Sequence, residues 1–208
     1  MMELNANLVK DLREKTGAGI MDCKRALAET GGNLEKAVVW LREKGIAAAA
    51  GRAGRVASEG SVGSYIHAGG KIGVLIEVNC ETDFCAKSEA FLALVKNLAM
   101  QVAASPSTRC VRREELPAAV IEQERQIYAS QAEGKPAVVV TKIVDGKIEK
   151  FYKEACLLEQ AYVRDPNKTV NDLLGEAAIQ MREKIDVRRF VRYQLGEALD
   201  AEATTAVA

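Results

Sequence analysis

Residues 61–79 read SVGSYIHAGGKIGVLIEVN and carry the clearest structural pattern in the chain. In the second half of this stretch, apolar side chains occupy every other position, which is the period of a β-strand with one face on a core. The glycine pair at 69 and 70 separates two such runs, and glycine is typical of a tight hairpin turn. We therefore predict a hairpin with strands at 61–67 and 72–79. Its buried face comprises Ile72, Val74, Ile76 and Val78.

Helical patterns follow this hairpin toward the carboxyl end. A stripe with helical spacing predicts a helix that ends before Ser105-Pro106-Ser107, because proline disfavours helix at the residue before it. The stripe consists of Phe91, Leu94, Val95, Leu98 and Val102. Beyond it we expect a helix from Leu116-Pro117 to about residue 131, and helical pieces on either side of Asp145-Gly146. An extended or loop segment is expected at 156–163 and a last helix from Thr169. The final expected element is a strand at 185–195 that returns to the sheet.

Toward the amino end, residues 5–45 predict three short helices. Glycine-containing segments at 16–19 and 30–32 separate them, and Asn33 is a suitable cap for the third. Gly45 follows a basic last turn, so we expect the third helix to end there. Residues 46–58 are rich in alanine and glycine and are interpreted as a linker with some helical content.

Together these patterns predict an α+β fold, in which helices pack a small antiparallel sheet. The expected organisation is a three-helix module at 1–45, a linker at 46–58, an α+β core at 59–200 and a disordered tail at 201–208. Nearly half of the 208 residues are hydrophobic, which is enough for a buried core.

Composition excludes several broad classes of function. Lysine plus arginine equals aspartate plus glutamate, at 29 each, so no net field favours nucleic acid or an anionic membrane. The sequence has neither an apolar run of about 20 residues nor an amino-terminal signal pattern, and we expect a cytoplasmic protein. The five cysteines lack a Cys-x-x-Cys pair, so free thiols, no metal and no cofactor are expected. The one histidine, His67, stands at the hairpin end and is interpreted as structural.

Four motifs, in this order, resemble the elongation factor Ts family. They are TGAGIMDCKRAL at 16–27, VNCETDFCAK at 78–87, LLEQ at 157–160 and RFVRYQLGE at 189–197. The likeness extends over about residues 3–199. Two positions depart from the pattern: Ile20 stands where many relatives have methionine, and Cys85 where many have valine.

This resemblance implies a module similar to ubiquitin-associated (UBA) domains, joined to a core dimerisation domain. It further implies a protein without catalytic activity that promotes GDP release from the GTPase elongation factor Tu, with a homodimer as its expected assembly. Magnesium displacement from the partner is assigned by resemblance to Thr82, Asp83, Phe84 and Cys85. A docking face is assigned to four residues of the amino-terminal module. They are Arg13, Ile20, Met21 and Lys24.

Other interpretations remain open at this stage. Thr82 or Asp83 could simply cap a helix while Phe84 packs into the core, and Met21 could equally be a core residue. Residues 16–27 contain two glycines but lack the Gly-Lys-Ser/Thr of a phosphate loop. The arginine pairs at 112–113 and 188–189 are interpreted as solvated charge. Two rival functions are an enzyme that uses Cys80 or Cys85, and an adaptor whose helical module binds ubiquitin-like or helical ligands.

Overall fold

The structure is a computed structural model that describes residues 6–16, 18–52, 54–134 and 136–197. The predicted tail at 201–208 therefore lies outside the described residues. The chain divides into two compact units. The first comprises Met1–Gly60, Asn79–Ser88 and Asp172–Asp186, and the second comprises Ser61–Val78, Glu89–Asn171 and Val187–Ala208. The boundaries at residues 45 and 58 stay a prediction.

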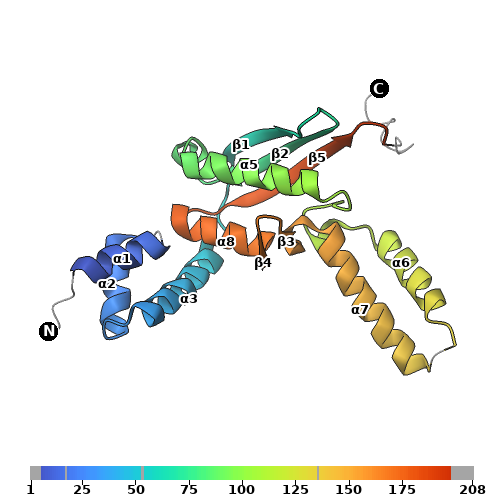
Figure 1. The fold of residues 1–208 in the computed structure, drawn as a ribbon, viewed down its shortest axis with the longest axis horizontal. Coiled ribbons are helices and arrows are strands. Elements are labelled where there is room, and N and C mark those ends of the chain that lie inside the picture. Colours follow the sequence, from blue (N-terminus) through green and yellow to red (C-terminus); the bar gives the residue numbers. More distant parts are fainter. Residues whose placement is uncertain (1–5, 17, 53, 135, 198–208) are drawn as a thin grey trace. The chain divides into compact units, whose positions relative to one another are not determined.

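The first unit contains the three amino-terminal helices, which pack against one another (Figure 1). They are α1 (Ala6–Thr16), α2 (Ile20–Glu29) and α3 (Leu34–Arg52). The Asn33 side chain accepts a hydrogen bond of 2.9 Å from the Lys36 amide, which confirms it as the cap of α3. The core of this bundle consists of Val9, Leu12, Cys23, Ala26, Leu27 and Ala37.

The expected end of the third helix at Gly45 is wrong, because α3 continues to Arg52. A Cβ atom at Gly45 would lie 2.7 Å from the Cδ1 atom of Ile179 in α8 (Val170–Met181). Gly45 therefore permits the close approach of another helix rather than ending its own. The alanine run that follows favours helix, so α3 takes up part of the predicted linker.

The second unit is built on the predicted hairpin. Strands β1 (Glu59–Ile66), β2 (Ile72–Cys80) and β5 (Asp186–Gln194) form a small antiparallel sheet in the order β1-β2-β5. At the turn, the Ile72 carbonyl accepts a hydrogen bond of 2.9 Å from the His67 amide. Gly69 and Gly70 have φ values of +88° and +69°, a left-handed backbone that glycine adopts without strain. The hairpin and the returning carboxyl-terminal strand are thus confirmed.

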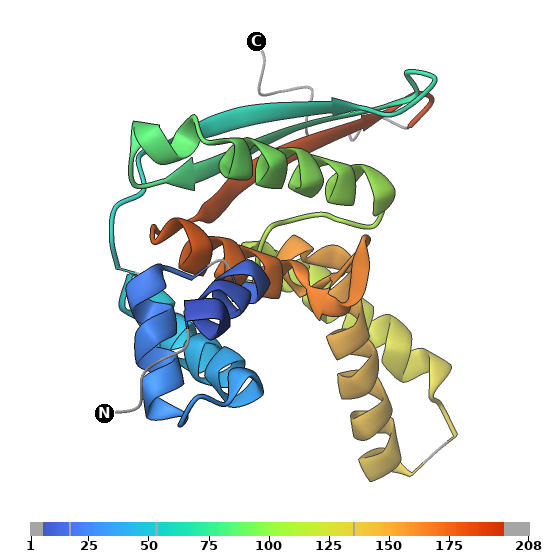
Figure 2. The same cartoon turned by 60° about the vertical axis from the view of Figure 1, so that its left-hand side comes forward.

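Helix α5 (Glu89–Ala104) runs along one face of this sheet, as two views show (Figures 1 and 2). All five residues of its predicted stripe are buried. Close packing requires a small residue on β1, because a Cβ atom at Gly63 would lie 2.3 Å from Cγ1 of Val95. The contact between α5 and β1 therefore depends on a glycine in the strand.

A helical hairpin forms the middle of the chain (Figure 2). Its arms are α6 (Ala118–Gln131) and α7 (Ala137–Ala155), which pack together. The predicted interruption at Asp145-Gly146 is wrong, because α7 is continuous. A single glycine costs a helix only about 1 kcal/mol, which the burial of Val144, Ile148 and Phe151 offsets.

Short elements complete the second unit and contain the LLEQ motif. They are η1 (Arg113–Glu115), η2 (Leu157–Glu159), β3 (Ala161–Tyr162) and β4 (Asp165–Thr169). Gln160 is buried, and its amide donates to the Thr108 hydroxyl at 2.7 Å while its oxygen accepts from Gln101 at 3.0 Å. Arg113 forms ion pairs with Glu149 and Glu159, so its interpretation as solvated charge is wrong.

We predict opposite effects for two glycine-to-alanine substitutions in this unit. Gly63→Ala should destabilise the protein by about 1–3 kcal/mol, because its methyl group would collide with Val95. The matched control is Gly146→Ala in α7, where a Cβ atom would meet open space. That variant should gain roughly 0.5–1 kcal/mol, because alanine is the better helix former. Urea unfolding measures both, and equal stability of the two variants would contradict the packing described here.

Candidate functional site

The Thr82-Asp83-Phe84 sequence forms a tight junction between a strand and a short helix. Strand β2 ends at Cys80, and α4 spans Asp83–Ala86. Thr82 has an extended backbone, and its hydroxyl accepts a hydrogen bond of 3.2 Å from the Cys85 amide. The capping role considered for Thr82 is therefore confirmed.

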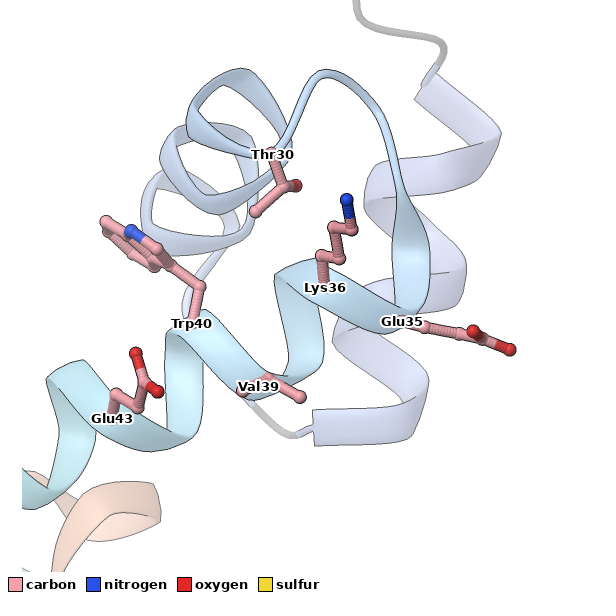
Figure 3. A pocket seen from close by; sticks show the side chains of 6 residues that line it. All are labelled: Thr30, Glu35, Lys36, Val39, Trp40 and Glu43. Atoms are coloured by element: carbon pink, nitrogen blue, oxygen red, sulfur yellow. The ribbon is translucent and has the colours of Figure 1, made fainter.

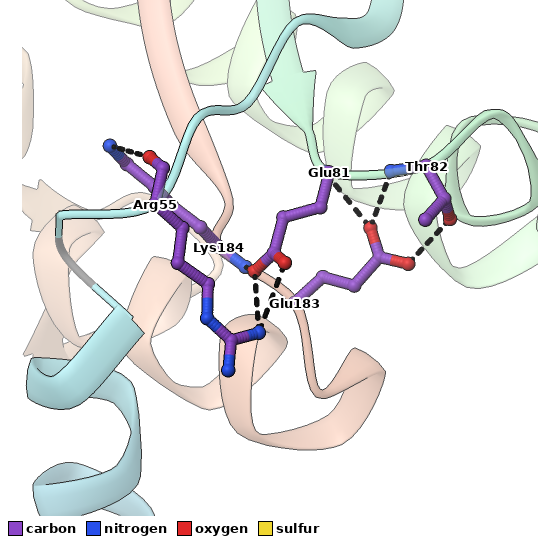
Figure 4. Close-up of polar contacts among 5 residues, drawn as sticks. All are labelled: Arg55, Glu81, Thr82, Glu183 and Lys184. Carbon is purple, nitrogen blue, oxygen red and sulfur yellow. Dashed lines mark hydrogen bonds and ion pairs between the residues drawn. The ribbon is translucent and has the colours of Figure 1, made fainter.

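The carboxylate of Glu183, which follows α8, holds this junction (Figure 4). Its Oε2 atom accepts hydrogen bonds of 3.0 Å from the backbone amides of Glu81 and Thr82. Its Oε1 atom accepts a third, of 2.5 Å, from the Thr82 hydroxyl. A charged acceptor makes stronger hydrogen bonds than a neutral one, so three of them fix the turn firmly.

Glu81 makes the reciprocal contacts with the segment that carries Glu183 (Figure 4). Its carboxylate accepts a hydrogen bond of 2.6 Å from the Lys184 amide and pairs with Arg55 at 3.0 Å. The Lys184 ammonium group donates in turn to the Arg55 carbonyl at 2.9 Å. The junction is thus bonded from both sides by segments far apart in sequence.

Phe84 projects from this junction into solvent, with 84% of its surface exposed. The alternative that Phe84 packs into the core is therefore wrong. Asp83 is also exposed, and its carboxylate pairs with Lys87 at 2.8 Å. The hydrogen bond from Lys87 lowers the pKa of Asp83, so this carboxyl group is ionised at neutral pH.

Cys85, the fourth residue assigned to this site, is buried rather than presented. Burial raises the pKa of its thiol to about 12, and the neighbouring Cys80 and Glu183 contribute to the shift. The pKa of Cys80 is also raised, again mainly by burial. A nucleophilic cysteine needs the opposite shift, so these two thiols do not form the site that the enzyme alternative requires.

The docking residues assigned to the amino-terminal module lie on α1 and α2. Ile20 and Met21 are 48% and 69% exposed, and Arg13 and Lys24 are exposed as well. Met21 is therefore a surface residue, and the alternative that placed it in the core is wrong. Helices flank residues 17–19 on both sides, where a phosphate loop would follow a strand.

Arg182 joins the module to the segment that holds the junction, and no local sequence pattern indicated this role. Its guanidinium group pairs with Asp22 of α2 at 2.6 Å. Gly19 makes room for this contact, because a Cβ atom there would lie 2.1 Å from Nη2 of Arg182. Arg182, Glu183 and Lys184 thus act as three consecutive positioning residues. Arg182 is bonded to α2, while Glu183 and Lys184 both bond to the segment at Glu81, and Lys184 also bonds to Arg55.

A surface hollow of about 320 Å³ lies elsewhere in the module, beside Trp40 (Figure 3). Lys44 lies over the indole ring, 5.5 Å from its centroid. The side chains drawn are not a nucleophile with its base, so the hollow does not resemble an active site. Its lining residues are Thr30, Glu35, Lys36, Val39, Trp40 and Glu43.

Within the described ranges, we find no helix with the length and apolar character needed to cross a lipid bilayer.

Comparison with known proteins identifies the family. A family model described as "Elongation factor TS" matches residues 6–197. The chain is 59% identical to elongation factor Ts of Desulforamulus reducens over 202 residues, which cover 96% of this chain and 93% of the relative. It is 57% identical to the elongation factor Ts of Geobacter metallireducens over 205 residues, covering 98% of this chain and 94% of the relative. The chain therefore belongs to the elongation factor Ts family of translation elongation factors.

Proposed function

We propose that this protein is a guanine-nucleotide exchange factor for elongation factor Tu. It binds the GTPase in the cytoplasm, displaces the magnesium ion, promotes GDP release and stabilises the nucleotide-free state, without catalysing a reaction of its own. Membership of the elongation factor Ts family supports this role. The observation that carries the mechanism is the exposure of Phe84 on a junction fixed by Glu183.

Exchange by this route depends on reciprocal binding. A factor that prefers the empty GTPase lowers the affinity of the GTPase for its nucleotide. The bound nucleotide lowers the affinity of the GTPase for the factor by the same ratio. A ten-thousandfold effect requires roughly 5.5 kcal/mol of differential binding. Full burial of a phenylalanine contributes only about 1.5–3 kcal/mol, so insertion of Phe84 cannot account for the whole effect.

The remaining differential binding free energy would come from the magnesium ion bound to the partner. Magnesium requires near-ideal octahedral geometry, so a small shift of its ligands costs much of its affinity. In this mechanism Phe84 inserts into the GTPase and moves those ligands. The ionised Asp83, next to Phe84 in the sequence, helps to hold the magnesium ligands in their displaced positions.

A second contact surface, on the amino-terminal helices, would contribute to binding of the GTPase. Ile20 and Met21 are exposed apolar side chains, with the basic Arg13 and Lys24 on the same two helices. Apolar side chains at the centre and charges at the rim are typical of protein interfaces. The structure describes one copy of the chain, and the proposed homodimer would bring two such surfaces into one assembly.

Phe84→Ala should slow the stimulated release of GDP from elongation factor Tu by roughly tenfold to a hundredfold, the effect of losing the burial of one phenylalanine side chain. Stopped-flow fluorescence of a labelled GDP measures the rate. The control is Val138→Ala in α7, which removes a side chain that is 71% exposed in the other unit. Full stimulation by a folded Phe84→Ala protein would refute the insertion mechanism.

Met21→Asp should weaken binding to nucleotide-free elongation factor Tu by about tenfold or more, because it places a charge at the centre of an apolar contact. Val39→Asp is the matched control, since Val39 is 55% exposed on α3 of the same module. Isothermal titration calorimetry compares the two variants with the original protein. Equal losses for both would place the docking face elsewhere in the module.

A further inference from the structure

Two thiols and a carboxylate converge behind the Thr82–Phe84 junction. Cys80 ends β2, Cys85 lies in α4, and Glu183 follows α8. Their ligand atoms, two Sγ and one carboxylate oxygen, all lie within 4.8 Å of one another. In the ranges that the structure describes, this is the one group of three or more His, Cys, Asp or Glu side chains with such spacing.

These residue types and distances suit zinc. Zinc is bound by cysteine sulfur at about 2.3 Å and by carboxylate oxygen at about 2.0–2.2 Å, usually in tetrahedral geometry. Two sulfur ligands of such an ion lie about 3.8 Å apart, so closing the present group onto an ion requires movements of about 1 Å at most. We propose that Cys80, Cys85 and Glu183 bind one Zn²⁺ ion.

The surroundings of the three groups already orient them. Glu183 Oε1 accepts a hydrogen bond from the Thr82 hydroxyl. A carboxylate oxygen can accept at two lone pairs, so this bond is compatible with coordination of an ion. Hydrogen bonds of this kind fix the direction of metal ligands and raise their affinity. The Met181 sulfur lies 3.6 Å from Cys85 Sγ. A water molecule would complete the tetrahedral coordination of the ion.

The charge of the ligand set also matches a divalent cation. A thiol that coordinates Zn²⁺ gives up its proton, so two thiolates and one carboxylate would carry enough negative charge to balance the ion. The ion would also connect Cys80 and Cys85, which flank the junction that presents Phe84. Binding of the ion does not depend on the proposed exchange function.

A second pair of buried cysteines provides a control for the proposed zinc site. Cys110 and Cys156 are also buried, and their sulfur atoms lie 3.7 Å apart. Their Sγ–Sγ distance matches that of a two-thiolate zinc site, but they are not part of a group of three metal ligands among the described residues. Removing this second pair should leave zinc binding intact.

Titration of the full-length, reduced protein with Co²⁺ tests the proposal. Cobalt substitutes for zinc and gives a thiolate-to-metal charge-transfer absorption that reports cysteine ligands. We expect one Co²⁺ per chain, displaced by one Zn²⁺. Cys80→Ala and Cys85→Ala should abolish the absorption, and Glu183→Gln should weaken Zn²⁺ binding tenfold or more. The Cys110→Ala/Cys156→Ala double variant should behave like the original protein.

A second measurement guards against loss of binding through unfolding. Zn²⁺ should raise the melting temperature of the original protein and of the double variant, but not that of Cys80→Ala or Cys85→Ala. The proposal is overturned if the original protein shows no stoichiometric charge-transfer absorption. It is equally overturned if the double variant loses the absorption, or if Glu183→Gln binds zinc as tightly as the original protein does.

Discussion

The candidate site depends on three consecutive residues between α8 and β5. Arg182 pairs with Asp22 of the helical module, Glu183 binds the Thr82 junction, and Lys184 bonds to Glu81 and Arg55. Arg182 adopts a left-handed backbone, with φ of +59°, at a cost of about 1–2 kcal/mol relative to ordinary helix. The contacts that these three residues make offset this cost.

In the proposed mechanism, a fixed junction would favour recognition by the exposed ring of Phe84. An exposed aromatic side chain gains hydrophobic free energy only when a partner covers it. On a mobile loop, much of that gain would be lost to the entropy of ordering the loop. Glu183 has already ordered the backbone of Glu81 and Thr82, so burial of the ring can contribute almost fully to binding.

Sequence reasoning succeeded where local periodicity determines structure. The stripe of α5 is buried as predicted, because that face packs on the core. In β2 the alternation predicted the burial of Val74, Ile76 and Val78 correctly, while Ile72, at the start of the strand, is only half-buried. It failed at Gly45 and Gly146, which lie inside helices, since tertiary packing outweighs the small helix penalty of one glycine.

Part of the candidate site was beyond local prediction for a different reason. The Thr82–Phe84 junction was found from its motif, and an acid beside an aromatic ring after a strand is a visible signal. Glu183 carries no such signal, because its contacts to Thr82 join residues about a hundred positions apart. The expectation of no metal rested on cysteine spacing alone, and that spacing could not reveal that Glu183 joins Cys80 and Cys85.

The central claim is that this protein acts by loosening the magnesium ion of its partner. It is tested most directly by the rate of labelled-GDP release from elongation factor Tu, with and without this protein, across a range of free magnesium concentrations. The account predicts strong acceleration at millimolar magnesium that becomes much smaller when the ion is chelated, because the loss of magnesium, which the protein assists, has then already occurred. Acceleration of equal size with and without magnesium would contradict it.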